Sequence, residues 1–225
     1  MLRDRLSADI SEFMHYLATR QEATGSLPPL AELSRELSIS VAALREQLEV
    51  ARALGLVEVR PRTGMRRLAY SFAPAIRQSL GYALALNNNE HFEKYSDLRN
   101  HIEATYWDEA VCKLTDEDKE GLKMLINRAW GKLRGAPVQV PHEEHRKLHL
   151  MIYSRLNNPF VTGILEAYWD AYEAVGLNVY AGGMDYLQEV WGYHSKMVEG
   201  ISSGNYTAGR EALIAHTDLL AHRPA

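Results

Sequence analysis

Histidine is the residue type with which this sequence could do the most chemistry, because several of its nine histidines fall on apolar helical faces. His145 and His149 lie four residues apart in the segment HEEHRKLHLMIYSRL, and residues at that spacing share one face of a helix. His194 and His216 lie on two further apolar stripes downstream. The spacing therefore predicts three helices that each turn histidine rings toward the core. Taken singly, such a ring is more often an ordinary core histidine than a ligand.

The remaining histidines and the single cysteine narrow the possible chemistry. His142 shares the face of His145 and could serve as a spare ligand, whereas His15, His91, His101 and His222 have no apolar stripe around them and are interpreted as surface residues. Because Cys112 is the only cysteine, the chain has no intramolecular disulfide and no zinc site built from several thiolates. A metal site would need histidine and carboxylate ligands.

One charged pair stands out upstream of these histidines. Arg99 and Glu103 are four residues apart in a segment whose predicted inward stripe is Phe92, Tyr95, Ile102 and Tyr106. The simplest interpretation is an ion pair within one helix. Aromatic residues at 153, 168, 169 and 172 could line a cavity, although such a stripe is more often plain core.

Arginine is concentrated near the N-terminus. Residues 1–70 hold ten Arg, no Lys and nine acidic residues, while the whole chain has a formal net charge of −4. Arg60, Arg62, Arg66 and Arg67 fall within eight residues that include no acid. A local basic patch matters more for nucleic-acid binding than the total charge, although the arginines could also form a merely solvated face.

The helices and strands predicted for this arginine-rich part of the chain follow the order of a known DNA-binding fold. The spacing predicts a helix before a break at residues 25–29, a short helix over LAELSREL, a tight turn, and a helix over VAALREQLEVARALG that Ser40 caps and Gly55 ends. LVEVRP and GMRRLAY around Arg62, Thr63 and Gly64 predict a two-stranded hairpin. Three helices followed by a basic hairpin are the layout of a winged helix-turn-helix.

From Pro74 onward the pattern is helical, with six or seven helices expected and Thr115 with Asp118 capping one of them. The fold class is thus mostly α: a winged helix-turn-helix (three helices plus a two-stranded wing) and a C-terminal all-α bundle. We expect a DNA-binding domain at 1–70, a linker helix at 71–88 and a helical domain at 89–225. No apolar run approaches the roughly 20 residues that span a bilayer, so we expect a cytoplasmic protein.

The stretch LPPLAELSRELSISVAALREQLEVARALGLVEVRPRTGMRRL resembles the winged helix of GntR-family transcription regulators, and the helical remainder with YSDLRNHIE and HxxLH is similar to the FCD-type effector domain of their FadR-like branch. This resemblance implies DNA contacts from the second helix of the motif and from the wing. On the matching positions these residues are Ser40, Ala42, Arg45, Arg60, Arg62, Thr63, Gly64, Arg66 and Arg67. The family usually has Arg where this chain has Ala31 and Val41, so its usual operator sequence is not expected here.

The resemblance also implies a metal site in the helical domain. Its ligands would be His145, His149, His194 and His216, holding a divalent ion such as zinc, nickel or manganese. The family has Asp where this chain has His145, so four neutral imidazoles would leave the metal's double charge uncancelled and favour an anionic effector. By the same resemblance, Arg99 would clamp a carboxylate or phosphate of a small ligand beside the metal, with Glu103 and Tyr153 near it.

The leading hypothesis is a homodimeric transcription regulator, a repressor as is usual in the family, that binds a palindromic double-stranded operator and responds to a small acidic metabolite. One alternative makes the metal itself the signal. Another makes the helical part a metalloenzyme, but Glu103 is the only candidate base and no HExxH motif is present. The sequence leaves open the effector, the operator, the direction of regulation and the metal.

Overall fold

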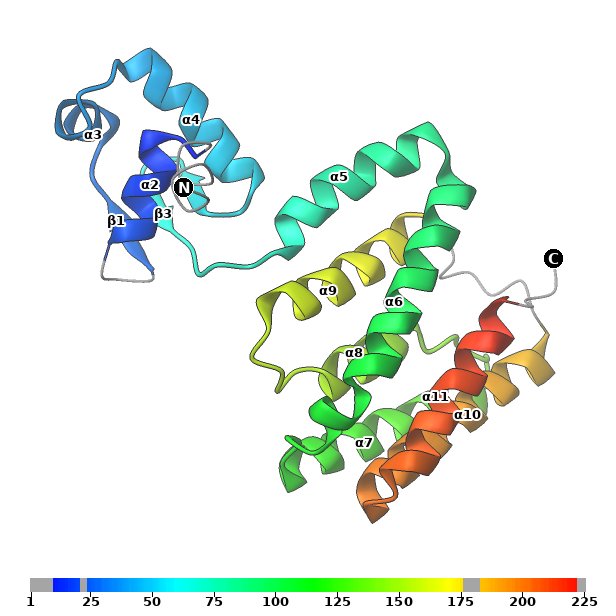
Figure 1. Ribbon diagram of the computed structural model, residues 1–225. Coiled ribbons are helices and arrows are strands. Elements are labelled where there is room, and N and C mark those ends of the chain that lie inside the picture. The colour runs from blue at the N-terminus through cyan, green and yellow to red at the C-terminus, as the bar shows by residue number, and fades with distance from the viewer. Residues whose placement is uncertain (1–9, 21–23, 176–182, 222–225) are drawn as a thin grey trace. The chain divides into compact units, whose positions relative to one another are not determined.

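A computed structural model describes residues 10–20, 24–175 and 183–221. The contacts divide the chain into two compact units between Ser79 and Leu80, called here the N-terminal unit and the helical unit, and each is described by itself (Figure 1). The division falls inside helix α5, Ala73–Leu86, which occupies most of the segment expected as a linker helix. The domain boundaries at residues 70 and 88 stay a prediction.

The N-terminal unit begins with helices. They are α2 (Glu12–Thr19), α3 (Leu30–Glu36) and α4 (Val41–Ala53). The predicted capping of α4 is confirmed: the Ser40 hydroxyl accepts a hydrogen bond from the Ala43 amide at 3.1 Å, and Gly55, with φ of 69°, follows the helix end. The apolar faces of the three helices meet in one core that includes Phe13, Leu33 and Leu44.

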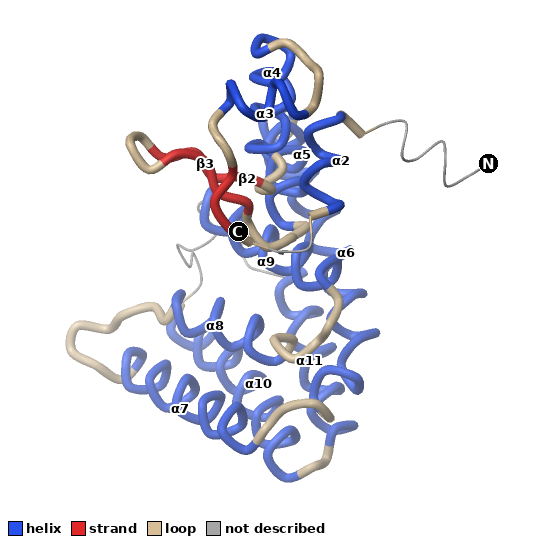
Figure 2. The backbone as a smooth tube through the Cα atoms, turned by 90° about the vertical axis from the view of Figure 1, so that its left-hand side faces the viewer, coloured by secondary structure: helices blue, strands red, loops and turns tan. Residues whose placement is uncertain are grey.

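The sheet of this unit has one strand more than the sequence predicted. Strands β2 (Val57–Arg60) and β3 (Gly64–Arg67) form the expected hairpin, and β1 (Gly25–Leu27) pairs with β3 on its other side, so that the antiparallel order is β1-β3-β2 (Figure 2). The predicted two-stranded wing is confirmed, and β1 is a third strand of the sheet that the sequence did not predict. The three residues of β1, which include Gly25, show too little alternation for the sequence to distinguish a strand from a break, and pairing with β3 makes them a strand.

The helical unit continues from α5. It contains α6 (Asn88–Val111), α7 (Asp116–Leu133), α8 (His142–Ile152), α9 (Pro159–Ala174), α10 (Met184–Ser203) and α11 (Tyr206–Ala221). The described residues from Ala73 onward thus hold seven helices, within the predicted six or seven. Thr115 and Asp118 form the predicted capping box at the start of α7. No helix in the described part of the chain is long and apolar enough to cross a membrane.

The helices of this unit surround one core. Helix α10 packs against α7 and α11, α8 packs against α7 and α9, and α6 packs against α9 and α11 (Figures 1 and 2). Trp107 of α6, Leu148 of α8 and Trp191 of α10 are fully buried in this core. The helices that carry the histidines of interest, α8, α10 and α11, are therefore all core helices.

Two glycines bring α10 and α11 unusually close together. A Cβ atom on Gly200 would lie 2.6 Å from the Gly209 nitrogen, and one on Gly209 would lie 2.7 Å from the indole of Trp107. Only glycine fits both positions, because real Cβ atoms do not approach neighbours so closely. This crossing sets the distance between the helices that carry His194 and His216.

We expect Gly200→Ala to destabilise the protein by about 1–3 kcal/mol, because the added methyl group forces the two backbones apart. Gly192→Ala is the matched control on the same helix: nothing lies within 4 Å of its added Cβ, and alanine is the better helix former by up to about 1 kcal/mol. Urea unfolding of both variants measures the difference. Equal stability of the two variants would contradict the close crossing.

Candidate functional site

The four predicted histidines converge in the core of the helical unit. His145 and His149 come from α8, His194 from α10 and His216 from α11. Each offers one ligand atom such that all four atoms lie within 4.8 Å of one another. None of the four side chains is more than 2% exposed. The structure therefore brings together, from three helices, the set that the sequence singled out, called here the histidine cluster.

Within the histidine cluster the rings face each other at ligand distances. The Nε2 atoms of His149 and His194 are 3.1 Å apart. Two nitrogen ligands at 2.0–2.1 Å from a tetrahedral zinc ion would be about 3.3 Å apart. The ring centroids of His194 and His216 are 4.2 Å apart, and those of His145 and His194 are 4.7 Å apart. The spacing suits one small cation between the rings.

Burial keeps the histidine cluster neutral. Loss of hydration lowers the pKa of His145, His194 and His216 well below the usual value, and mutual repulsion with neighbouring cationic groups lowers it further. Burial also lowers the pKa of His149, although Glu103 opposes the shift. Neutral imidazole is the form that binds metal.

Several ring nitrogens of the histidine cluster lack a hydrogen-bond partner among the described residues, and a metal ion could bind to such atoms. Among the described residues, His194 Nδ1 and both ring nitrogens of His216 have no hydrogen-bond partner. A buried polar atom without a partner costs about 1–3 kcal/mol. An ion bound to one nitrogen of each ring would remove part of that cost, so the donor set fits a divalent metal that accepts imidazole.

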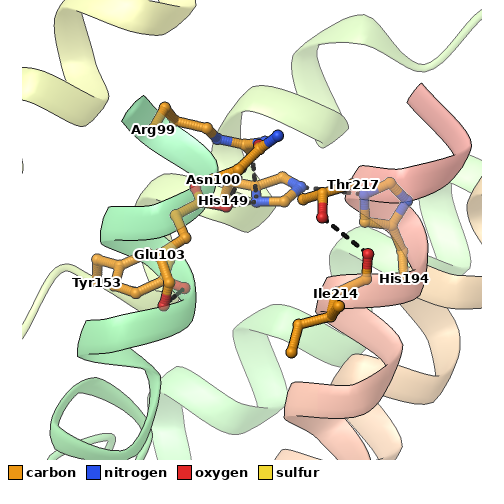
Figure 3. A network of polar contacts seen from close by, with 8 residues as sticks. All are labelled: Arg99, Asn100, Glu103, His149, Tyr153, His194, Ile214 and Thr217. Carbon is orange, nitrogen blue, oxygen red and sulfur yellow. Dashed lines mark hydrogen bonds and ion pairs between the residues drawn. The ribbon is translucent and has the colours of Figure 1, made fainter. Parts of the chain in front are cut away.

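Arg99 and Glu103 adjoin the histidine cluster rather than solvent. The Arg99 Nη2 atom lies 3.0 Å from Glu103 Oε2 and 2.8 Å from His149 Nδ1, and Glu103 Oε2 lies 3.2 Å from the same Nδ1. Figure 3 shows this contact reaching from α6 to His149, with His194 on the far side of the ring. The predicted ion pair is confirmed. Arg99 and Glu103 are 1% and 0% exposed, so both also face the core, and the inward stripe expected for this helix was incomplete without them.

Aromatic side chains enclose the guanidinium. The Arg99 Cζ atom lies 4.8 Å from the ring centroid of Tyr168 and 5.6 Å from that of Trp169. Trp169 also reaches His145, with centroids 4.7 Å apart. Tyr153 donates a hydrogen bond to the Glu103 carbonyl oxygen at 2.8 Å. These residues line the site and belong to the core at the same time.

Arg99 determines the charge of Glu103. Burial alone would raise the pKa of the Glu103 carboxyl, but the adjacent guanidinium of Arg99 holds it below the usual value. Two buried atoms of the pair, Arg99 Nε and Glu103 Oε1, have no hydrogen-bond partner among the described residues. The pair is thus ionised and incompletely bonded.

Glu103 lies on the side of His149 away from the other histidines. Its carboxylate faces Nδ1, whereas Nε2 faces His194. A carboxylate in this position orients a ligating histidine and fixes its tautomer. It is not placed to take a proton from a water molecule on the metal side of the ring, so the arrangement gives no support to the metalloenzyme alternative.

The other histidines do not join this group. His142 is only partly buried and does not belong to the histidine cluster, because seven residues, about 10 Å along a helix axis, separate it from His149. His15 and His101 are exposed, as expected, and His91 is half-buried. His222 lies outside the described residues.

Two polar residues next to the site were not predicted from the sequence. Asn100 accepts a hydrogen bond from Arg99 Nη1 at 3.1 Å, and Glu144, which is 5% exposed, forms an ion pair with Lys132 at 2.7 Å beside His145. Neither has a local signal, since Asn100 is merely the next residue and Lys132 lies on another helix.

The residues predicted to contact DNA all lie in the N-terminal unit. Ser40, Ala42 and Arg45 are exposed on the first turns of α4, and Arg62, Thr63 and Gly64 are exposed at the hairpin turn. In the adjoining strands, Arg60 pairs with Glu58 at 2.9 Å and Arg66 is exposed. Arg67 is partly buried and donates to the Arg20 carbonyl oxygen at 3.3 Å, so it faces away from Arg66.

Comparison with known proteins agrees with this architecture. The FCD domain model matches residues 95–219, more than half of the chain, and the chain therefore belongs to the FCD-domain family. Its fold is similar to that of a Streptococcus agalactiae GntR protein (17% identity, TM-score 0.71, covering 94% of this chain and 96% of that one). It is also similar to Escherichia coli McbR/YncC (16% identity, TM-score 0.52, covering 99% and 96%).

The family match confirms the FCD domain that the sequence resemblance implied, and the two solved structures share the fold of this chain. At these identities the two solved structures show the fold alone. No curated protein sequence matches this chain significantly.

The lowered pKa values of the buried histidines predict acid sensitivity of the metal-free protein. In the unfolded chain these imidazoles take up protons below about pH 6.5, whereas in the folded protein they stay neutral to lower pH. The unfolded state then binds more protons, so the free energy of unfolding is complete above about pH 6.5 and falls as the pH decreases. Each such histidine contributes up to about 1.4 kcal/mol per pH unit.

Urea unfolding of chelator-treated protein between pH 7.5 and 5.5 measures this slope. His216→Leu should reduce it by up to one proton's contribution, while His101→Gln, at an exposed position, should leave it unchanged. An identical slope in the wild type and His216→Leu would show that His216 is not held neutral.

Proposed function

We propose that this chain is a DNA-binding transcription regulator, acting as a homodimeric repressor, whose operator affinity is controlled by a small carboxylate-bearing effector. The effector binds beside a divalent metal in the helical unit. We assign DNA binding to residues 1–70, a linker helix to 71–88 and effector binding to 89–225. Such a protein works in the cytoplasm, where its operator lies.

One observation carries the proposal: a single chain joins a winged helix-turn-helix to an FCD domain that contains a buried cluster of four histidines. The similarity in fold to a protein named as GntR supports the same conclusion. A buried cluster in which His194 Nδ1 and both ring nitrogens of His216 have no hydrogen-bond partner among the described residues has no structural advantage over an apolar core, since unpaired buried polar atoms are costly. Its presence favours a ligand.

DNA recognition is assigned to α4 and the wing. Helix α4 enters the major groove in such folds, so that its first exposed residues, Ser40, Ala42 and Arg45, meet base edges. The exposed wing arginines Arg60, Arg62 and Arg66, with Thr63 and Gly64 between them, contact phosphate or the minor groove, whereas Arg67 faces away from Arg66 and is left out of this assignment. A two-fold dimer would read a palindrome, since one winged helix covers only a half-site.

Metal binding is assigned to His145, His149, His194 and His216, with zinc, nickel or manganese as the ion. A bound divalent ion would supply a positive charge that attracts an anionic ligand. Arg99 is placed to hold a carboxylate beside it, and Glu103 and Tyr153 keep His149 and Arg99 in position. An effector changes operator affinity only if it binds one arrangement of the dimer better than the other.

A second candidate is a regulator for which the metal is the signal. It is favoured by the number of imidazoles, because four neutral ligands complete a tetrahedral zinc shell without any further group. The two candidates differ in whether zinc alone changes operator affinity.

We expect Arg45→Ala to weaken specific operator binding by about 1–3 kcal/mol, because it removes a base contact. Arg62→Ala and Arg66→Ala should weaken specific and non-specific binding alike, because they remove phosphate contacts. Fluorescence anisotropy on an operator selected from genomic fragments, repeated over a range of salt concentrations, measures both effects. Arg128→Ala, an exposed arginine of the helical unit, is the control.

Unchanged DNA binding in all three wing and α4 variants would refute the assignment of the N-terminal unit. Titration of the wild type with buffered zinc in the same assay separates the two candidates. A change in operator affinity with zinc alone favours the metal-responsive regulator, and no change favours the effector-responsive one.

A further inference from the structure

Helix α3, the first helix of the helix-turn-helix, has an exposed arginine that the proposed DNA contacts do not include. Arg35 lies in the last turn of α3, and its Nε atom donates a hydrogen bond to the Ala31 carbonyl oxygen at 3.2 Å. Residues four apart share one helix face, and the side chain of the later residue points back toward the earlier one. The bond therefore holds the guanidinium on the exposed face of α3, toward Ala31.

The charge of Arg35 has no partner in the described part of the chain. Its terminal nitrogens, Nη1 and Nη2, form no hydrogen bond or ion pair there, although Glu32 and Glu36 lie on the same helix. Arg52, an exposed arginine of the same unit, differs because it pairs with Glu49 at 2.8 Å. The Arg35 guanidinium is thus held in position at one nitrogen and open to an anion at the other two.

The turn that follows α3 fixes Arg35 relative to α4. The Ser34 hydroxyl donates to the Ile39 carbonyl oxygen at 2.6 Å, and the Ile39 amide donates to the Ser34 carbonyl oxygen at 3.2 Å. Helix α3 also packs against α4, the helix proposed to enter the major groove (Figure 1). These contacts set the distance between the Arg35 guanidinium and the first turn of α4.

An arginine at this place is suited to the DNA backbone. In helix-turn-helix proteins the second helix lies in the major groove, while the first helix crosses the phosphate backbone. A guanidinium binds a phosphate through two parallel N–H···O bonds, and such charged hydrogen bonds are stronger than neutral ones. The free edge formed by Nη1 and Nη2 of Arg35 matches this geometry.

We propose that Arg35 binds a phosphate of the operator backbone and so adds a contact from α3 to those from α4 and the wing. This inference rests on the proposed function and extends it to a residue outside the predicted set. A phosphate contact fixes the position of a protein on the duplex without reading the sequence. Arg35 therefore determines how α4 lies in the groove, while Arg45 contacts a base.

The salt dependence of DNA binding by the full-length protein tests the inference. Binding of Arg35→Gln to the operator and to a random-sequence duplex is compared with that of the wild type by fluorescence anisotropy. The slope of log affinity against log salt concentration should decrease in magnitude by about 0.9 for each protomer bound, because each protomer loses one phosphate contact. Affinity for both duplexes should fall by about tenfold per protomer at low salt, since a charged hydrogen bond is lost.

Two further variants separate a phosphate contact from a structural role. Arg35→Lys retains the charge and should retain the salt slope, whereas Gln removes the charge at similar helix propensity. Arg52→Gln is the matched control and should leave the slope unchanged, because Arg52 is already paired with Glu49. A wild-type slope in Arg35→Gln, or an equal decrease in Arg52→Gln, would overturn the inference. A loss of affinity confined to the operator would indicate a base contact and would also contradict it.

Arg45→Ala, measured in the same series, distinguishes the two levels of failure. If it weakens operator binding while Arg35→Gln does not, the contact from α3 is wrong and the proposed regulator stands. If the wild type binds neither duplex, the proposed function fails, and the inference with it.

Discussion

Four imidazoles in a buried helical core impose a constraint that the rest of the helical unit must satisfy. Each neutral ring brings one donor and one acceptor into a region shielded from bulk solvent, and unpaired buried polar atoms are costly. The rings of His149 and His194 meet each other, yet His216 has no hydrogen-bond partner among the described residues. The close crossing of α10 and α11 at Gly200 and Gly209 nevertheless holds these rings together. A cation that accepts nitrogen ligands resolves this conflict.

Much of this arrangement was predictable because it is periodic. Apolar spacing located the helices, capping residues such as Ser40 and Thr115 marked their starts, and the i, i+4 spacing placed His145 and His149 on one face. Convergence of rings from three helices was implied only by family resemblance, since helix periodicity says which way a ring points but not what it meets.

What the sequence did not reveal depended on distant partners. Arg99 and Glu103 have the spacing of an ordinary exposed pair, and contacts from distant parts of the chain, such as His149 of α8 and Tyr168 of α9, accompany their burial. Strand β1 exists because β3 pairs with it. Likewise, only the structure shows that Glu103 faces Nδ1 of His149, on the side away from His194.

X-ray absorption spectroscopy at the zinc edge of the protein purified without chelator tests the central claim most directly. The account predicts about one zinc per chain, with nitrogen neighbours at about 2.0–2.1 Å and the outer-shell scattering of three to four imidazole rings. In His194→Ala the metal content should fall. A spectrum dominated by water oxygens, or a metal content that does not depend on His194, would contradict the assignment of these histidines to a metal.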